Sequence, residues 1–425
     1  MNEVSVFESA PEHWERVRLK FLVRDDVPAE KQKELTDAEE ASFLPMEAIG
    51  EEGSLDLSET VSIDDVANRY TQFFENDVLV AKITPCFENG KGAVARRLVN
   101  GIGYGTTELY VLRPREDVLP EYLYYLTANP DFRKRGEAAM TGAAGQKRVP
   151  REFIQNYRVA VPPVEEQKQI IHALENRLRQ LDELLQAKNK LLDELDEKRR
   201  GVIARAVTRG LDDGVPMRDS GHPWISEIPA HWEFRRLATL FREIDERNEP
   251  ELPLLHVSLN TGVTKREFED DRIERVASDF STYKVARRGD IVFNKMRMWQ
   301  GAVGVAPIDG LVSPDYVVAR PGDEVNPSYF ENLFRTPLMN AEFARHSHGL
   351  VWDRLRLYWS GFKNVRVPIP PLEEQRSIVE YIDSETELID SVRSGTAETI
   401  DLLKERRTAL IAAAVTGRLG AGVLA

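Results

Sequence analysis

The side chains in this sequence that are best suited to chemistry are polar and basic groups that form hydrogen bonds, and they do not make up a catalytic set. Arg, Lys and Gln make the charged or bidentate contacts that phosphates and base edges accept. Two groups of such residues are candidates for contacting a nucleic acid. The first group is Lys82, Thr84, Lys91, Gln146, Lys147 and Arg148. The second group is Lys295, Arg297, Gln300, His346, His348 and Arg354. For each single residue, an ordinary surface role is the alternative interpretation.

Motifs for catalysis on phosphates are incomplete. A phosphate-binding glycine loop needs an upstream Gly, a Lys and a following Ser or Thr, and Gly90-Lys91-Gly92 supplies only the Lys. A metal-dependent nuclease needs an Asp followed later by an acid-x-Lys triplet. Asp131 precedes the triplet Asp196-Glu197-Lys198, but that triplet lies within a long heptad pattern. An exposed helix face explains it better.

Methyl transfer and metal binding are not supported either. An amino-methylating DNA methyltransferase holds the flipped base with a polar residue, two prolines and an aromatic residue. Here the Pro-Pro pairs have apolar neighbours, such as Val161 and Val164. The seven His and the single cysteine, Cys86, form no cluster with metal-ligand spacing. The sequence therefore predicts no catalytic residue, no metal site and no cofactor.

Two loops must position several of the candidate residues. The loop Thr141–Arg148 begins with small residues and ends in the run Gln146-Lys147-Arg148. The matching stretch His348–Arg354 has Gly349 in register with Gly142, but it lacks the Gln-Lys-Arg run. Two copies of a loop at equivalent positions with different side chains suit a scaffold that recognises two different targets.

The elements behind these loops are duplicated. Val161-Pro162-Pro163-Val164-Glu165-Glu166-Gln167 returns as Ile369-Pro370-Pro371-Leu372-Glu373-Glu374-Gln375, at an offset of 370 − 162 = 208. Each copy opens an apolar-periodic run that ends in Ala-Val-Thr at the same offset. A Pro pair suits the start of a helix, and Glu in the first turn suits the helix dipole. The sequence predicts two long, related helices.

The first run has a heptad pattern, with Lys188 as the exception, and the second run keeps half of that pattern and is interrupted at Thr396. In the first run the apolar residues seven apart are Ile171, Leu178, Leu185 and Leu192, and Leu174, Leu181 and Leu195. Such a seam needs a covering helix. Because both runs belong to one chain, we expect them to pair as an antiparallel coiled coil. Basic residues are then expected on the outer faces, open to partners: Lys198, Arg199, Arg406 and Arg407.

The segments that precede the helices are also related. Pro11-Glu12-His13-Trp14 returns as Pro229-Ala230-His231-Trp232. We expect each Trp to anchor the start of its domain with the His covering it, and base stacking is the alternative. Residues 24–70 predict a short strand among loops and a helical piece. Strand patterns follow at 77–82, 92–95, 110–114 and 157–160, and again at 290–295, 301–304, 317–321 and 364–367, with helices beginning near Pro120 and Pro327.

Composition limits the class of protein. A duplicated chain of 425 residues predicts two domains. A single cysteine indicates a reducing compartment, and no apolar run approaches about 20 residues, so we expect a cytoplasmic protein without a membrane segment. The net charge of −14 is concentrated in residues 1–71, which hold 18 acidic and 7 basic side chains. Residues 72–160 and 281–368 are mildly basic, so the overall acidity does not exclude a nucleic-acid partner.

The duplicated motifs resemble the specificity subunit of Type I restriction-modification systems. The resemblance rests on both Pro-x-His-Trp segments, both helix starts and Ala-Val-Thr ends, the loop Thr141–Arg148 and Phe43-Leu44-Pro45-Met46-Glu47. It covers nearly the whole chain. It implies an α+β fold with two similar target recognition domains, at 1–160 and 216–368, and two conserved helices, at 161–215 and 369–425.

The resemblance implies a non-catalytic function. Each recognition domain would read one half of a bipartite, asymmetric site in double-stranded DNA. The helices would dock two modification (methyltransferase) subunits, and restriction (endonuclease/translocase) subunits would complete the complex. A helix of about 40 residues spans roughly 60 Å, so an antiparallel pair would set the spacer between the half-sites. Two rivals remain: a two-headed protein-binding scaffold with a coiled-coil spacer and no DNA role, and an enzyme that acts alone.

Overall fold

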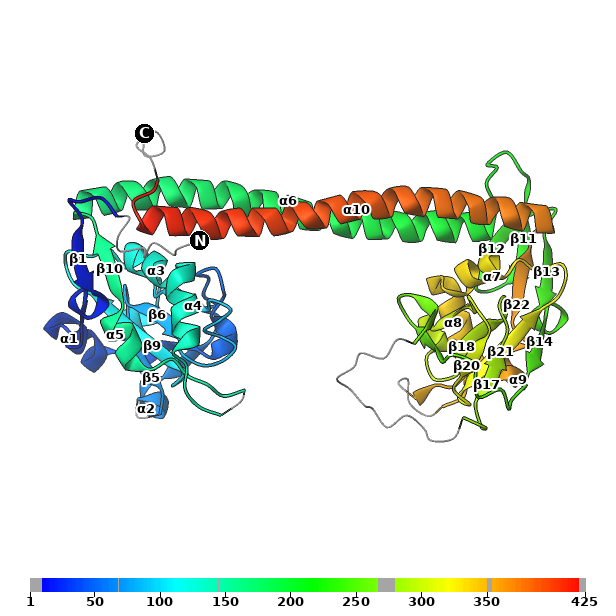
Figure 1. Cartoon of the computed structure of the whole chain (residues 1–425), viewed down its shortest axis with the longest axis horizontal. Coiled ribbons are helices and arrows are strands. Elements are labelled where there is room, and N and C mark those ends of the chain that lie inside the picture. The colour runs from blue at the N-terminus through cyan, green and yellow to red at the C-terminus, as the bar shows by residue number, and fades with distance from the viewer. Residues whose placement is uncertain (1–9, 68, 144, 267–279, 350–353, 420–425) are drawn as a thin grey trace. The chain divides into compact units, whose positions relative to one another are not determined.

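The computed structural model describes residues 10–67, 69–143, 145–266, 280–349 and 354–419. The chain divides into two compact units, one made of residues 1–189 and 398–425 and the other of residues 190–397. Each unit combines a globular α/β region with part of each of two long helices, α6 (Val164–Arg209) and α10 (Leu372–Val415) (Figure 1). Among the described helices, none is long and apolar enough to cross a membrane.

The first unit contains two four-stranded sheets. Their strands are β2 (Val23–Arg24), β3 (Glu40–Leu44), β4 (Thr60–Ser62), β5 (Thr71–Phe74), β6 (Val78–Ala81), β7 (Gly92–Val94), β8 (Ile102–Gly105) and β9 (Leu109–Pro114). One sheet has the order β2-β9-β6-β7 and the other has the order β4-β3-β8-β5, in which β3 and β8 are parallel. The strands expected at 77–82, 92–95 and 110–114 are confirmed as β6, β7 and β9.

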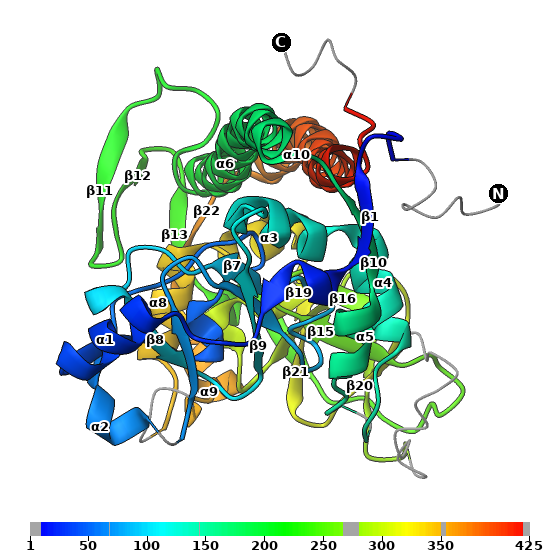
Figure 2. The same ribbon diagram turned by 90° about the vertical axis from the view of Figure 1, so that its left-hand side faces the viewer.

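Helices cover the first of these sheets. They include α3 (Pro120–Ala128), α4 (Pro130–Ala138) and α5 (Arg151–Asn156), and α3 lies between the sheet and the long helices (Figures 1 and 2). Pro120 and Pro130 stand at helix starts, where a backbone N–H has no partner to lose. Residues 24–70 hold more than the expected strand and helical piece: α1 (Ala29–Asp37), α2 (Ile63–Val66), β3 and β4.

A buried ion pair joins the central strands of the first unit. Asp77 precedes β6 and is fully buried, and its carboxylate accepts hydrogen bonds from Nε and Nη2 of Arg113 on β9 at 2.9 and 2.8 Å. The backbone N–H of Phe74 donates to the same carboxylate at 2.8 Å. A buried charge is tolerated only when it is paired and hydrogen-bonded in this way.

The second unit repeats the first sheet in the order β14-β21-β18-β19. The strands of the second unit's globular region, those of this sheet included, are β14 (Phe241–Ile244), β15 (Leu255–Ser258), β16 (Gly262–Lys265), β17 (Lys284–Ala286), β18 (Ile291–Asn294), β19 (Val303–Val305), β20 (Gly310–Val312) and β21 (Tyr316–Pro321). The expected strands at 290–295 and 317–321 are confirmed as β18 and β21. The strand expected at 301–304 begins only at Val303, because Gly301 has a φ of +90° and ends a short 3-10 helix.

The buried ion pair is repeated as well. Asp290 precedes β18 and accepts from Nε and Nη2 of Arg320 on β21, both at 2.9 Å, while the N–H of Arg287 donates to it at 2.9 Å. The helices of this unit are α7 (Pro327–Phe334), α8 (Pro337–Arg345) and α9 (Trp359–Phe362). A hairpin, β11 (Met217–His222) with β12 (Ile225–Pro229), precedes the sheet.

The duplicated tryptophans join each globular region to its long helix. Trp14 is buried, its Nε1 donates to Glu166 of α6 at 3.0 Å, and Nε2 of His13 lies 2.8 Å from the other oxygen of Glu166. In the second unit, Trp232 and His231 contact Glu374 of α10 at the same two distances, 3.0 and 2.8 Å. Trp is therefore an anchor, as expected. The Glu of the repeated motif is its hydrogen-bond acceptor.

The Gln of the repeated motif fixes the next helix of its unit. Oε1 of Gln167 accepts from the N–H of Leu119, which precedes α3, at 2.9 Å, and Nε2 donates to the carbonyls of Asp117 and Pro162. Oε1 of Gln375 likewise accepts from the N–H of Asn326, which precedes α7, and its Nε2 donates to the carbonyls of Glu324 and Pro370. Next to these contacts, short strand pairs lead into the long helices: β1 (Glu15–Arg18) with β10 (Arg158–Val161), and β13 (Glu233–Arg236) with β22 (Arg366–Ile369).

Within each unit the two helices pair in antiparallel fashion. In the first unit, Leu174 and Leu178 of α6 share a core with Ile411 and Ala414 of α10. In the second unit, the end of α6 packs on the start of α10 through Ala206, Val207, Ile378 and Ile382. Thr396, which was expected to interrupt the seam, is buried.

Ion pairs define the register, and they correct one expectation. Arg407 lies 3.2 Å from Asp182 in the first unit, and Arg199 lies 3.5 Å from Asp390 in the second. These two pairs are copies at the offset of 208. The prediction that Arg199 and Arg407 lie on the outer faces is wrong, because both reach the facing helix. Lys198 and Arg406 are exposed, since adjacent residues on a helix point about 100° apart.

Candidate nucleic-acid interface

Backbone hydrogen bonds bring three distant segments of the first unit together at the end of β6. The N–H of Lys82 donates to the carbonyl of Glu108 at 2.9 Å, and the carbonyl of Lys82 accepts from Val149 at 2.9 Å. The N–H of Thr84 donates to the carbonyl of Lys147 at 3.0 Å. The sequence candidates Lys82, Thr84 and Lys147 are therefore neighbours, although they come from different parts of the chain.

The loop Thr141–Arg148 is closed at its base. The N–H of Arg148 donates to the carbonyl of Thr141 at 2.8 Å, and the N–H of Thr141 donates back at 3.0 Å. Gly142 has a φ of +127°, and a Cβ there would lie 2.9 Å from the carbonyl oxygen of Gln146, so glycine is required. Gln146 and Lys147 are exposed near the end of this loop.

Arg148 forms the best-defined polar contact of this cluster. Its Nε and Nη2 donate to the two oxygens of Glu108 at 2.9 and 2.8 Å, and its Nη1 donates to the carbonyl of Gln146 at 3.2 Å. The hydrogen bonds from Arg148 hold the pKa of the Glu108 carboxyl below its usual value, and the charge of Lys82 adds to this effect. Glu108 is therefore ionised at neutral pH, where it forms an ion pair with Arg148.

The remaining candidates of the first unit already have partners within the fold. Nζ of Lys82 lies 5.4 Å from the ring centre of Tyr110, and the hydroxyl of Thr84 donates to the sulfur of Met140 at 3.4 Å. Nζ of Lys91 donates to the carbonyl of Met46 at 2.9 Å. Lys91 thus holds a neighbouring loop, and its contact with a nucleic acid stays a prediction.

The second unit repeats both backbone hydrogen bonds of Lys82 at the end of β18, but not that of Thr84, because the N–H of Arg297 donates to the carbonyl of Asn294. The N–H of Lys295 points to the carbonyl of Asp315 at 3.4 Å, and the carbonyl of Lys295 accepts from Leu357 at 2.8 Å. His348 and Arg356 exchange two backbone hydrogen bonds, both of 2.9 Å, as Thr141 and Arg148 do. Residues 350–353 of this loop lie outside the described residues.

Arg356 is a candidate that the motif comparison missed. It takes the place of Arg148 in the backbone pattern, and it also lies 208 residues further along the chain. Arg354 and Leu355 stand where the first unit has Gln146 and Lys147. The Gln-Lys-Arg run itself is absent from the second loop, as expected, but its last residue has a counterpart in Arg356. Applying the helix offset to the loop would have found Arg356.

The other candidates of the second unit are spread around this point. Arg297 and Gln300 are exposed at the start and at the end of the short 3-10 helix (Met298–Gln300). His348 and Arg354 are exposed on the loop. His346 is half-buried at the end of α8, where its Nδ1 lies 3.1 Å from the carbonyl of Glu342. Contact of each with a nucleic acid remains a prediction.

Two lysines position the turn that carries Asp315. Nζ of Lys295 donates to the carbonyl of Pro314 at 3.1 Å, and Nζ of the buried Lys284 donates to the carbonyl of Tyr316 at 3.0 Å. Burial lowers the pKa of Lys284, and the nearby charge of Lys295 lowers it further. Lys295, a sequence candidate, therefore has a structural role in this turn.

The geometry offers recognition chemistry. It combines exposed amides, guanidinium groups and ammonium groups on loops that a sheet supports, which is the set of groups that contacts phosphates and base edges. Among the residues that the structure describes, no three His, Cys, Asp or Glu side chains are arranged to hold a metal ion.

Comparison with known proteins gives a consistent picture. Residues 11–194 match the family model of the Type I restriction modification DNA specificity domain. The chain is 45% identical to the Type I restriction enzyme EcoAI specificity subunit of Escherichia coli over 200 residues, which are 46% of this chain and 33% of that protein. The matched part thus spans about a third of that relative's length. The MjaVIII specificity subunit of Methanocaldococcus jannaschii is 22% identical over 96% of this chain and 93% of its own.

Solved structures share the fold. A structure from work on complex assembly and conformational transition of the type I R-M system aligns with a TM-score of 0.72 at 20% identity, covering 96% of this chain and 98% of that chain. The HsdS subunit from Thermoanaerobacter tengcongensis aligns with a TM-score of 0.57 at 20% identity, covering 98% and 100% of the two chains. The mixed α+β fold with long helices is therefore shared along nearly the entire length.

Proposed function

We propose that this chain, which belongs to the family of Type I restriction-modification specificity subunits, is the non-catalytic subunit that selects the DNA sequence for its complex. Each globular region reads one half of a bipartite, asymmetric site in double-stranded DNA. The observation that carries this proposal is a repeated backbone contact at the end of each loop. The carbonyl of Lys82 accepts a hydrogen bond from the N–H of Val149, and the carbonyl of Lys295 accepts one from the N–H of Leu357.

The differences between the two loops support two different half-sites. Both backbone hydrogen bonds of Lys82 and the pair that closes the base of the loop recur in the second unit, so each loop is held at the same place on its own sheet. The side chains at equivalent positions differ: Gln146 against Arg354 and Lys147 against Leu355. Because hydrogen-bonding groups specify base edges, such a change of side chains on a constant scaffold changes the sequence that is read.

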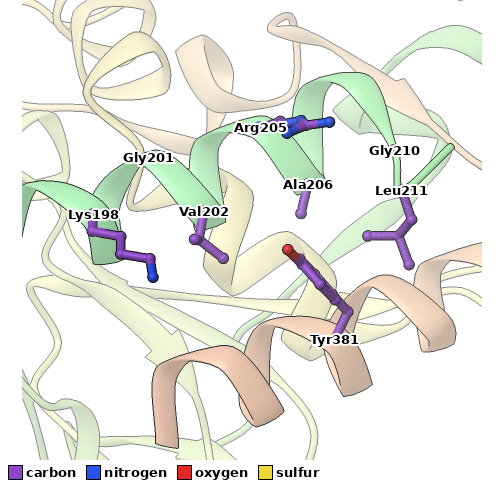
Figure 3. A pocket seen from close by; sticks show the side chains of 8 residues that line it. All are labelled: Lys198, Gly201, Val202, Arg205, Ala206, Gly210, Leu211 and Tyr381. Atoms are coloured by element: carbon purple, nitrogen blue, oxygen red, sulfur yellow. The ribbon is translucent and has the colours of Figure 1, made fainter. Parts of the chain in front are cut away.

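We assign recognition of DNA to residues 1–160 and 216–368, and docking of partners to residues 161–215 and 369–425. Two modification subunits would bind the helices, restriction subunits would join them, and the complex would act in the cytoplasm. One surface suited to docking is a hollow of about 370 Å³ on the helices of the second unit (Figure 3). Tyr381 and Leu211 are both partly exposed there, beside the basic side chains of Lys198 and Arg205.

Methylation mapping tests this function directly. In cells that express the chain with its modification subunits, we expect methylated adenines within a two-part motif. Replacing residues 1–160 with those of another family member is expected to change one half of that motif and leave the other half intact. A change of both halves, or of neither, would contradict the assignment of one half-site to each domain.

Salt dependence separates DNA recognition from a protein-binding scaffold. The purified complex should bind duplex DNA with an affinity that falls steeply as salt rises, because phosphate contacts release counterions. We expect the slope to decrease by about one when Lys147 is replaced by Ala, since each phosphate contact contributes roughly one unit. Binding that is weak at all salt concentrations would favour the scaffold. Methyl transfer by the isolated chain would favour an enzyme that acts alone.

A further inference from the structure

We propose that Glu108 is a positioning residue that orients Arg148 to read a guanine in the half-site of the first unit. This inference rests on the proposed function and deepens it. The carboxylate of Glu108 accepts hydrogen bonds from both Nε and Nη2 of Arg148. The guanidinium is therefore held along one edge and cannot rotate freely. The same carboxylate stands on the segment before β9, whose backbone is fixed by Lys82.

The donors that remain on Arg148 suit a guanine edge. A guanidinium has five N–H groups, and the contacts with Glu108 and with the carbonyl of Gln146 use one each on Nε, Nη2 and Nη1. One N–H on each terminal nitrogen is therefore left without a partner among the described residues. Two donors on adjacent nitrogens match the N7 and O6 acceptors that guanine presents in the major groove.

Partial exposure of the pair fits this role. The side chain of Arg148 is 44% exposed and that of Glu108 is 24% exposed, so the guanidinium lies at the surface while its acceptor lies deeper. Holding the long side chain of an arginine before binding favours bidentate recognition, because ordering the side chain on binding would otherwise cost conformational entropy.

The second unit supplies a natural contrast. Arg356 occupies the place of Arg148, and Asp315 occupies the place of Glu108. The side chain of Asp315 is one methylene shorter than that of Glu108. In the part of the chain that the structure describes, the side chains of Asp315 and Arg356 form no hydrogen bond or ion pair with each other or with another residue. Arg356 is exposed. An arginine without a fixed orientation suits a phosphate, which accepts hydrogen bonds from many directions.

Selection from a randomised duplex library tests the proposal without knowledge of the target. The complex of the full chain with its modification subunits would be incubated with duplexes that carry a random segment, and the bound fraction would be sequenced. The wild type should select a two-part motif with at least one guanine in the first half. Glu108→Gln and Arg148→Lys should each relax the preference for the same guanine by roughly tenfold to a hundredfold.

Matched variants and the second half-site are the controls. Asp315→Asn is expected to leave the motif unchanged, and the second half of the motif reports on folding and assembly of every variant. Equal loss at all positions of the first half in Glu108→Gln would mean that the pair only anchors the loop, and would overturn the inference. So would an unchanged guanine preference. If the wild type selected no motif, the proposed function itself would fail.

Discussion

Inserting seven residues into the middle of both long helices is expected to lengthen the spacer between the recognised half-sites by up to about three base pairs. One heptad adds about 10 Å to a helix, and B-DNA rises about 34 Å per ten base pairs. Methylation mapping of the insertion variant would give the new spacer directly. An unchanged spacer would show that the helices do not set it.

The register of the helices identifies where to insert. The interhelical pairs Asp182–Arg407, Asp196–Arg393 and Arg199–Asp390 have residue numbers that each add up to 589. By the same sum, residue 190 faces residue 399 and residue 191 faces residue 398. Insertions after residues 190 and 398 therefore lie opposite each other and leave all three ion pairs in register. A seven-residue insertion in α6 alone is the contrasting variant. It shifts one helix against the other, and we expect it to abolish methylation, whereas replacing a heptad with another of equal length should leave the spacer unchanged.

Replacing Asp77 with Ala is expected to destabilise the first unit by about 3–5 kcal/mol, because the change leaves the buried Arg113 without its counter-charge. The carboxylate of Asp77 is fully buried and accepts three hydrogen bonds, two from Arg113 and one from the backbone of Phe74. Hydrogen exchange measures this effect locally. Amides of β6 and β9 should exchange faster, and those of β18 and β21 should not change.

The duplicated ion pair provides the matched experiment. Asp290→Ala removes the same group from the second unit, so its effect should fall on β18 and β21 and spare β6 and β9. Each variant thereby serves as the control of the other. If Asp77→Ala left exchange in β6 and β9 unchanged, the pair would contribute to specificity of the fold and not to its stability.

Much of the architecture follows from the sequence because the chain is duplicated. The constant offset of 208 between the helix starts predicted two related helices, and the periodic apolar residues predicted that each would need a covering partner. Apolar runs preceded by Asp predicted β6 and β18, since an alternating or fully apolar run of this length is typical of a buried strand. The short strands around residues 24–70 were not separated, because local patterns there are weak.

The sequence by itself determined the two-fold repetition, the long helices, the start of α3 at Pro120 and the anchoring role of the tryptophans. Only the tertiary structure decided which polar side chains meet. Glu166 lies in the first turn of α6, as expected for the helix dipole, and it also accepts the indole N–H of Trp14, which the sequence did not indicate. Arg199 was expected to face outward, but it reaches Asp390. Glu108 gave no signal in the sequence, because 40 residues separate it from Arg148. Local periodicity fixes which face of an element is apolar, whereas the partner of a charged group depends on how segments distant in the chain are brought together.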